Sequence, residues 1–251
     1  FMILIASTRF SNGFLEPTHL TSNRFNRDNE LNSIKDLYTS GEGPSKSSYG
    51  YVPSTNNVHP LPNESSIIVQ GNSLRTWSYQ SPYVEQVQVE LSSEGRPFDA
   101  DIELWHGPDN TPCKMRVYVE NGKLRPFNAV VQTPRAPNTV AIRNIGQLEF
   151  PFSANVKAVD FDIMSKDCVA SSRIIQGGAL RTYIFEPIVD AVQVFLDTDG
   201  RPLNARIELL QGPNNNKQVI ELYTEDGFDR PFFCILKTPD SGNVVRVLNT
   251  A

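Results

Sequence analysis

A long internal repeat constrains the fold of this chain more than any other feature of its sequence. The stretch VQVELSSEGRPFDADIELWHGPDN, residues 87–110, recurs at residues 192–215 as VQVFLDTDGRPLNARIELLQGPNN. The likeness begins at residues 65 and 171 and runs to residues 144 and 249, with a spacing near 105 residues. Such a spacing fits two whole domains, because the units of solenoid proteins are only about 20–50 residues long. One module has therefore been used twice.

Alternation of apolar and polar residues dominates each copy. Apolar and polar residues alternate in the stretch Val87, Gln88, Val89, Glu90 and Leu91. This is the pattern of an antiparallel strand with one buried face and one solvent-exposed face. Strands are expected in the first copy near residues 67–70, 74–79, 84–91, 99–106, 114–120, 127–132, 138–144 and 148–157. Eight short strands without a helical period predict an all-β chain of two tandem antiparallel β-sandwich domains, jelly-roll-like in form.

Both copies contain an acidic or amide residue followed by glycine at two matching positions. Residues 94–95 (Glu-Gly) match residues 199–200 (Asp-Gly), and residues 121–122 (Asn-Gly) match residues 226–227 (Asp-Gly). Dipeptides of this kind favour tight turns between paired strands. The sequence therefore predicts two hairpins in each copy.

The repeat divides the chain into four segments. We expect an extended N-terminal arm at 1–64, a first β-sandwich at 65–157, a connector at 158–170 and a second β-sandwich at 171–251. The first copy continues past residue 144 with IGQLEFPFSANV, which should form its last strand, but the second copy stops at residue 251. The last strand of the second copy is thus apparently missing. We favour truncation; the alternative is an open edge that awaits another segment by strand addition.

The arm differs in composition from the two copies. It is rich in Asn, Ser, Thr, Gly and Pro, with one short helix expected at about residues 28–40 and an extended linker over residues 41–64. Plain disorder is one interpretation. We favour the other, in which spaced apolar side chains bind grooves on a partner. The candidate partner-binding residues of the arm are Phe10, Phe14, Phe25, Leu31, Ile34, Tyr38, Tyr49 and Tyr51.

Composition and motifs argue against several functions. A pI near 5.3 disfavours nucleic acid as the main partner, and no apolar run reaches the length of a membrane span. The three cysteines form no metal-binding motif, and no catalytic set is recognisable. His106 is replaced by Gln211 in the second copy, which weakens its claim to be a shared general base. We therefore expect no enzyme, no metal and no cofactor.

Arg-Pro pairs are the most distinctive repeated residues. A guanidinium beside a rigid turn could bind a carboxylate or phosphate of a partner. We favour the other interpretation, in which the arginines pair internally with Glu103 and Glu208, or with Glu120 and Glu225. The four arginines remain candidate partner-binding residues: Arg96, Arg125, Arg201 and Arg230.

Two further groups of residues lie on the polar register of the predicted strands. Trp105 corresponds to Leu210, and two apolar residues there suggest an outer face that is covered by the other domain or by a partner. Asp99 and Asp101 flank an inward-facing alanine, so we interpret them as a solvated strand face rather than as a pair of catalytic carboxylates.

The repeated pattern LRT(W/Y), VQV, GRP, EL, GP(D/N)N, RPF and TP, with LEFPF in the first copy, resembles a family of duplicated β-domain proteins in plastids of red-lineage algae. It is also similar to rod-stabilising linker proteins of the red-algal phycobilisome. The resemblance covers residues 65–251. It implies a chloroplast protein, stromal or attached to the thylakoid through its assembly, with phycobiliproteins and other linkers as candidate partners. Cys113 could then carry a bilin, although a plain surface thiol is favoured.

The leading hypothesis is a non-enzymatic scaffold that stabilises a large protein assembly, with a photosynthetic antenna as the expected setting. It rests on a duplicated fold without catalytic residues, joined to an arm with spaced aromatic residues. The alternative is a carbohydrate-binding, lectin-like module, suggested by Trp105 beside the turn at residues 107–110.

Overall fold

The computed structural model describes residues 2–8, 66–160 and 172–251, and for residues 2–8 it describes the backbone alone. The described residues form strands, turns and bends, with no helix among them, so the all-β prediction is confirmed. The expected helix at residues 28–40 lies outside the described residues. The strands are β1 (Met2–Thr8), β2 (Ile67–Val69), β3 (Leu74–Tyr79), β4 (Gln86–Ser92), β5 (Phe98–His106), β6 (Asn110–Val119), β7 (Phe127–Gln132), β8 (Asn138–Asn144), β9 (Phe152–Ala158), β10 (Arg173–Ile174), β11 (Leu180–Ile184), β12 (Ala191–Asp197), β13 (Leu203–Gln211), β14 (Asn216–Thr224), β15 (Phe232–Lys237) and β16 (Asn243–Asn249).

Each repeat has the strand order of a jelly roll. In the first repeat, one sheet has the order β2-β9-β4-β7 and the other has the order β3-β8-β5-β6. Successive strands therefore alternate between the sheets, except for the paired strands β5 and β6. The second repeat follows the same order, with β10, β12 and β15 in one sheet and β11, β16, β13 and β14 in the other. The eight strands expected in the first copy are present, with small shifts of their ends.

The expectation of two hairpins per copy is wrong. Residues 94–95 connect β4 to β5, which lie in different sheets, and residues 121–122 connect β6 to β7, which also lie in different sheets. Turn-forming dipeptides specify a reversal of the chain, but they do not determine whether the two flanking strands pair. The hairpin of each copy is instead β5–β6 and its counterpart β13–β14, closed by the Gly-Pro turn.

The glycine of the Asn-Gly turn is required by close packing between two loops. A Cβ atom at Gly122 would lie 2.5 Å from the Ser93 hydroxyl oxygen and 2.7 Å from the Phe98 ring. At the matching Gly227, a Cβ atom would lie 2.5 Å from the Thr198 hydroxyl oxygen. Because real Cβ atoms do not approach so closely, the loops between the sheets need glycine at this position in both repeats.

Buried asparagine side chains explain other repeated residues. The amide of Asn138 donates to the Thr133 carbonyl at 2.9 Å, and the amide of Asn243 donates to the Thr238 carbonyl at 3.1 Å. Both asparagines are almost completely buried. Their amides donate hydrogen bonds to loop carbonyl groups that have no partner in a neighbouring strand. Each such carbonyl, if buried without a donor, would destabilise the protein by about 1–3 kcal/mol. Thr133, Pro134 and Asn138 are therefore framework residues.

The core lies between the two sheets and runs through both repeats. The alternation seen in the sequence sorts side chains between the faces: Val87, Val89 and Leu91 are completely buried, as are Val192, Val194 and Leu196 in the matching strand β12. One aromatic contact is Phe98 with Phe152, whose ring centroids are 5.2 Å apart. Burial of this apolar ladder is the main force that holds the sheets together.

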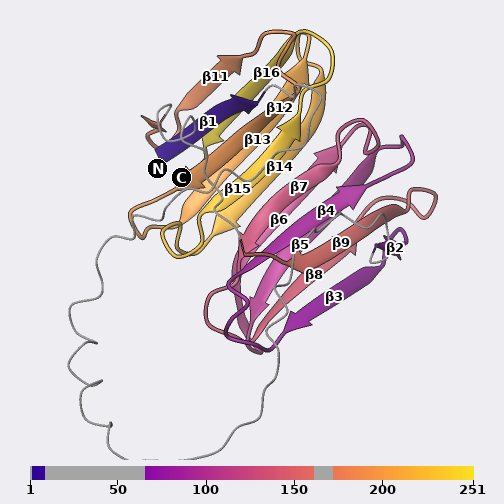
Figure 1. Cartoon of the computed structure of the whole chain (residues 1–251), viewed down its shortest axis with the longest axis vertical. Coiled ribbons are helices and arrows are strands. Elements are labelled where there is room, and N and C mark those ends of the chain that lie inside the picture. The colour runs from indigo at the N-terminus through magenta and orange to yellow at the C-terminus, as the bar shows by residue number, and fades with distance from the viewer. Residues whose placement is uncertain (1, 9–65, 161–171) are drawn as a thin grey trace, which may run out of the picture. The chain divides into compact units, whose positions relative to one another are not determined.

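Strand β1 occupies the place in the second repeat that β9 occupies in the first. β9 lies between β4 and β2, and β1 lies between β12 and β10, antiparallel to both neighbours. In Figure 1 the indigo β1 accordingly lies among the orange and yellow strands of the second repeat. The seven residues of β1 pair with β12 along its whole length, from Met2 opposite Asp197 to Thr8 opposite Ala191. The N-terminal segment thus supplies the eighth strand of the second jelly roll.

The register of β1 places alternate residues on the core side. Ile5 lies opposite Val194, which is completely buried, whereas Ala6 lies opposite Gln193, which is partly exposed. Directly opposed residues of antiparallel strands share one face of the sheet. Position 5 is therefore on the core face of the second jelly roll, and position 6 is on its outer face.

We expect Ile5→Asp to destabilise the second jelly roll by about 3 kcal/mol, because it places a charge on the buried face. Hydrogen exchange should accelerate in β12 and leave the matching strand β4 unchanged. Ala6→Asp is the matched control, since the same charge would lie on the outer face. Equal exchange in β12 for both variants would contradict the register of β1.

Candidate interaction surfaces

The two jelly rolls are joined edge to edge, so that each sheet continues from one repeat into the other. β6 pairs with β14 in one sheet, and β7 pairs with β15 in the other. Arg116 lies opposite Glu221, and Ala129 lies opposite Cys234. In each pair the two residues are the same position of the repeat. The repeats are thus related by a pseudo-two-fold axis between these strands, as two subunits are in an isologous dimer.

Backbone hydrogen bonds extend this symmetry beyond the paired strands. The Glu120 amide donates to the Lys217 carbonyl at 2.9 Å, and the matching Glu225 amide donates to the Pro112 carbonyl at 2.8 Å. Side chains then differ between the two ends: Lys217 forms an ion pair with Glu120 at 2.7 Å, whereas Glu225 accepts from the Asn110 amide at 3.5 Å. The junction is symmetric in its backbone and asymmetric in its side chains.

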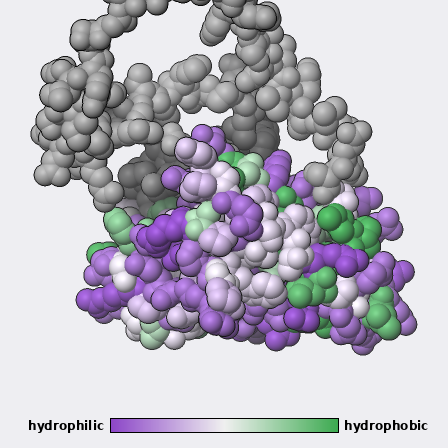
Figure 2. Space-filling view, turned by 90° about the horizontal axis from the view of Figure 1, so that it is seen from below, coloured by the Kyte–Doolittle hydropathy of each residue, from purple (hydrophilic) through white to green (hydrophobic). Residues whose placement is uncertain are grey.

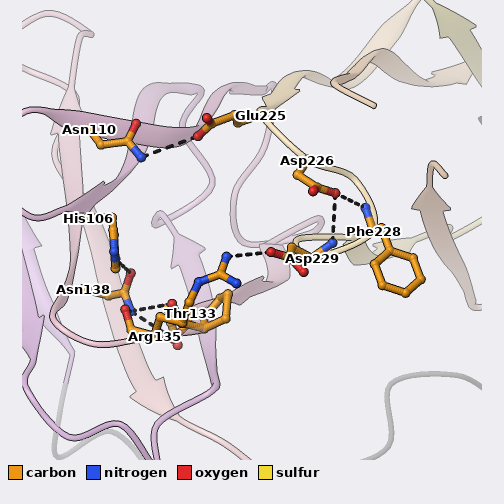
Figure 3. A network of polar contacts seen from close by, with 10 residues as sticks. His106, Asn110, Thr133, Arg135, Asn138, Glu225, Asp226, Phe228 and Asp229 are labelled. Carbon is orange, nitrogen blue, oxygen red and sulfur yellow. Dashed lines mark hydrogen bonds and ion pairs between the residues drawn. The ribbon is translucent and has the colours of Figure 1, made fainter. Parts of the chain in front are cut away.

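Polar side chains from both repeats meet at one end of this junction (Figure 3). The guanidinium of Arg135 lies 2.6 Å from a carboxylate oxygen of Asp229, which belongs to the other repeat. Asp229 is positioned by Asp226, whose side chain accepts hydrogen bonds from two backbone amides of the turn. Because Arg135 is largely exposed, the ion pair contributes at most about 1 kcal/mol. The backbone pairing of β6 with β14 and of β7 with β15 is therefore the main contact between the repeats.

Two of the four candidate arginines are buried at the junction. Arg125 is 2 % exposed, and its Nη2 donates to Oε1 of Gln211 in the other repeat at 2.7 Å. Arg230 is 6 % exposed. Burial is the main cause that lowers the pKa of both Arg125 and Arg230. Their placement suits a contact between repeats rather than contact with a separate protein.

The other two candidate arginines lie on the surface. Arg96 lies over the ring of Phe150, with its guanidinium carbon 5.9 Å from the ring centroid. The matching Arg201 is highly exposed and lies 3.5 Å from a carboxylate oxygen of Asp199. None of the four arginines forms an ion pair with the glutamates considered above in the described part of the chain. Those glutamates contact Trp105 (Glu103), Arg206 (Glu208), Lys217 (Glu120) and Asn110 (Glu225).

Trp105 lies on the outer face of β5 and is partly exposed. Its indole N–H donates to Oε2 of Glu103 at 2.8 Å. Leu210, at the matching position, is almost fully buried. His106 contacts Oδ1 of Asn138 through Nδ1 at 3.2 Å, which makes it part of the loop framework. The aromatic and aliphatic candidates of the arm lie outside the described residues, so their partner-binding role stays a prediction.

Asp99 and Asp101 lie among charged residues on the outer face of the sheet that contains β5, β6, β13 and β14. Arg116 lies 3.5 Å from Asp99, and Arg206 forms ion pairs with both Glu208 and Glu221. Burial, above all, raises the pKa of Asp101. A hollow of about 660 Å³ crosses the β6–β14 pair here. Arg116 with Asp99 and Arg206 with Glu221 are cross-strand pairs, whereas Arg206 and Glu208 both lie on β13; all three are ordinary stabilising contacts of a sheet.

The sequence suggested that Cys113 is a surface thiol. This expectation is wrong, because Cys113 is only 4 % exposed. β6 begins at Asn110, earlier than predicted, so Cys113 belongs to the strand and faces the core. Burial raises the pKa of this thiol to about 12. Cys234 is also buried, and burial raises its pKa as well. A buried, protonated thiol is a poor nucleophile and a poor attachment point for a pigment.

The outer edges of the jelly rolls carry most of the exposed large apolar side chains. Within the described residues, β3 pairs only with β8, and β11 pairs only with β16. Several of these exposed residues occupy matching positions of the two repeats: Ile68 with Ile174, and Tyr83 with Ile188. The full set at these edges is Ile67, Ile68, Tyr83, Ile174, Leu180, Ile184 and Ile188. On the face seen in Figure 2, hydrophilic residues predominate and hydrophobic residues form a few separate patches.

This apolar edge set does not follow from the sequence pattern alone. Part of it is visible in the sequence, because Ile68 matches Ile174 and Tyr83 matches Ile188. Five of the seven lie in strands β2, β10 and β11 and two lie in loops, and the alternation of a strand cannot reveal whether its open edge is covered. Unpaired apolar edges in a native protein mark sites of association, since they would otherwise lead to aggregation.

Features of other functions are absent from the described residues. No cluster of three or more His, Cys, Asp or Glu side chains there could hold a metal ion. Over the same residues, no helix has the length and apolar character needed to cross a membrane.

The fold and its surfaces define a tandem jelly-roll protein whose conspicuous features are its joined sheets and its apolar edges. The family model described as diatom pyrenoid shell protein matches residues 61–251. The chain belongs to this family. A comparison with curated proteins found no match. The membership supports a structural role in a protein assembly of the plastid, and it gives no support to the narrower expectation of a phycobilisome linker.

We expect Gln211→Ala to destabilise the protein by about 3 kcal/mol, because it removes the hydrogen-bond partner of the buried Arg125 guanidinium. His106→Ala, at the matching position, should cost only about 1 kcal/mol, because it removes a hydrogen bond to the neutral Asn138 side chain. Denaturant unfolding of both variants measures the difference. Equal losses would show that Arg125 does not depend on the contact between repeats.

We also expect the thiols of Cys113 and Cys234 to react with a disulfide reagent only after unfolding, in a chain that carries Cys168→Ser. The reaction at mildly alkaline pH should follow the rate of unfolding and rise sharply in denaturant, because the native thiols stay protonated and buried. Rapid reaction of the folded chain would contradict their placement in the core.

Proposed function

We propose that this chain is a structural subunit of a pyrenoid shell in the chloroplast and joins further copies of itself through the outer edges of its two jelly rolls. The observation that carries the proposal is the repetition of exposed apolar residues at the two opposite edges of a continuous pair of sheets. The family to which the chain belongs agrees with this function. No catalytic step is part of the proposal.

The outer edges offer both components of a sheet-to-sheet contact. An open edge strand presents backbone N–H and carbonyl groups that another strand can pair. The apolar side chains beside it then become buried, and burial of one large aliphatic side chain contributes about 1.5–3 kcal/mol. Ile184 at 82 % exposure and Tyr83 at 92 % exposure have the most area to bury.

A second copy is the partner that these edges fit best. The chain already joins two jelly rolls edge to edge at β6–β14 and β7–β15, which extends both sheets without a break. Four of the seven apolar residues of the outer edges form two matching pairs, Ile68 with Ile174 and Tyr83 with Ile188, so the two outer edges of one chain are related. Two edges on one subunit allow copies to associate into an extended layer, because each contact leaves the opposite edge of the subunit available.

The test is the assembly of the purified full chain, followed by sedimentation and by electron microscopy over a range of concentrations. We expect Ile184→Lys combined with Ile188→Lys to raise the concentration needed for assembly about tenfold or more, because two apolar side chains can no longer be buried. Both residues are exposed, so the unfolding temperature should change little.

Phe228→Lys is the control for this experiment. Phe228 is 71 % exposed, but it lies in the turn near the junction of the repeats rather than at an outer edge. Its substitution should leave assembly unchanged. If the control weakens assembly as much as the edge variant does, or if the edge variant assembles normally, the proposed contact is wrong.

A further inference from the structure

A small cavity lies between the two repeats, beside the buried Arg230. It measures about 10 Å³ and is lined by Cys113 and Met115 of β6 and by Thr224 and Arg230 of the second repeat, among others. Cys113 and Thr224 are opposite each other in the β6–β14 pair, so the cavity lies where the two jelly rolls meet. About 10–15 Å³ is the least volume that holds one water-sized particle. The cavity therefore has room for a single small occupant.

Arg230 is a buried cation without a hydrogen-bond acceptor. The residue is 6 % exposed, and its Nε atom is completely buried and has no hydrogen-bond partner. The carboxylates of Asp229 and Glu225 lie near enough to favour its charge. Neither forms an ion pair with Arg230 among the described residues, and Asp229 pairs with Arg135 instead, at 2.6 Å. Because a buried charged donor without an acceptor destabilises the fold, the Nε–H of Arg230 needs an acceptor from outside the described residues.

The hydroxyl group of Thr224 is a second unpartnered donor at the cavity. Thr224 is 2 % exposed, and its Oγ1 is completely buried and has no hydrogen-bond partner. A threonine hydroxyl rotates freely and can point its hydrogen into the cavity. Gln132 also lines the cavity, is partly exposed and can present its amide N–H there. The polar side chains around the cavity are thus all able to donate.

The matching arginine at the other end of the junction has the acceptor that Arg230 lacks. Arg125 donates from Nη2 to Oε1 of Gln211 at 2.7 Å. His106 takes the position of Gln211 beside Arg230, and it contacts Oδ1 of Asn138 through Nδ1 at 3.2 Å. Two arginines at the same position of the repeat therefore differ in whether the protein accepts their hydrogen bonds.

The residues that form the cavity also differ between the repeats. Cys113 corresponds to Gln218, which is 1 % exposed, and Thr224 corresponds to Val119. Glutamine is much longer than cysteine, so Gln218 fills beside Arg125 the volume that Cys113 leaves open beside Arg230. Valine has the shape of threonine but no hydroxyl donor. The cavity and its second donor thus belong to the Arg230 end of the junction.

We propose that this cavity is a binding site for one monatomic anion such as chloride, held by the Nε–H of Arg230 and the hydroxyl of Thr224. An anion accepts from both donors at once and brings no hydrogen of its own, whereas a water molecule brings two that need acceptors. It also places a negative charge beside the buried guanidinium. The unbranched side chain of Met115 can adjust to an ion that is somewhat larger than water.

The first test compares the unfolding temperature of the purified full chain in sodium chloride and in sodium gluconate at equal ionic strength. Gluconate is far too large for the cavity. We expect a saturable rise of about 4 °C in chloride, because an ion that binds only the folded chain stabilises it by mass action. Equal unfolding temperatures in the two salts would overturn the proposal.

Two variants carry the residues of the Arg125 end into the cavity. Thr224→Val removes one donor with little change of shape and should weaken chloride binding about tenfold. Cys113→Gln combined with Thr224→Val also fills the cavity and should abolish the chloride effect. Cys234→Ala is the control, because Cys234 is buried but does not line the cavity, and it should retain the full effect. An unchanged chloride effect in Thr224→Val would contradict the site.

Bromide identifies the occupant directly. In crystals grown with bromide, we expect an anomalous scattering peak within hydrogen-bond distance of Nε of Arg230. Density there without an anomalous signal would mean a water molecule and would overturn the proposal.

The same salt comparison on the Ile184→Lys, Ile188→Lys variant separates this site from the proposed function. The cavity lies within one chain, so the chloride effect should persist in a variant that no longer assembles. Loss of the effect there would assign it to assembly and contradict the site. Normal assembly of that edge variant would contradict the edge contact and leave the anion site in place.

Discussion

The edge-to-edge pairing of β6 with β14 and of β7 with β15 is the constraint on which the rest of the structure depends. It converts two jelly rolls into one pair of continuous sheets and buries Arg125 and Arg230 where the repeats meet. Because the pairing uses the same edge of each repeat, the remaining edges necessarily lie at opposite ends of the sheets. The location of the exposed apolar residues follows from this geometry.

The sequence predicted the local structure well because local structure depends on local patterns. Alternation in Val87, Val89 and Leu91 placed these residues in the core, and the number of strands in the first copy was correct. Turn chemistry was a weaker guide, since residues 94–95 reverse the chain between two sheets rather than within one. Cys113 was assigned to a turn only because the start of β6 was placed too late.

Contacts between segments that are distant in the chain could not be predicted from the sequence. Nothing in the pattern of Arg125 distinguishes a guanidinium that meets Gln211 in the other repeat from one that faces a partner. The apolar residues Ile174 and Ile184 look like core residues in the sequence, and only the strand order shows that they lie at an open edge. The duplication was informative for a different reason: the matching residues Glu120 and Glu225 contact Lys217 and Asn110 respectively, so the two ends of the junction have different side-chain contacts on the same backbone arrangement.

The origin of the eighth strand also affects how the protein folds. β1 is synthesised before every other described strand, yet its partners β10 and β12 are among the later ones, so that Thr8 pairs with Ala191. The first jelly roll can complete its sheets from consecutive residues as they leave the ribosome. The second has to close a loop of more than half the chain, and long-range pairing of this kind slows folding. Until that closure the β12 edge is open, which makes the last step of folding the one most exposed to pairing with the wrong strand.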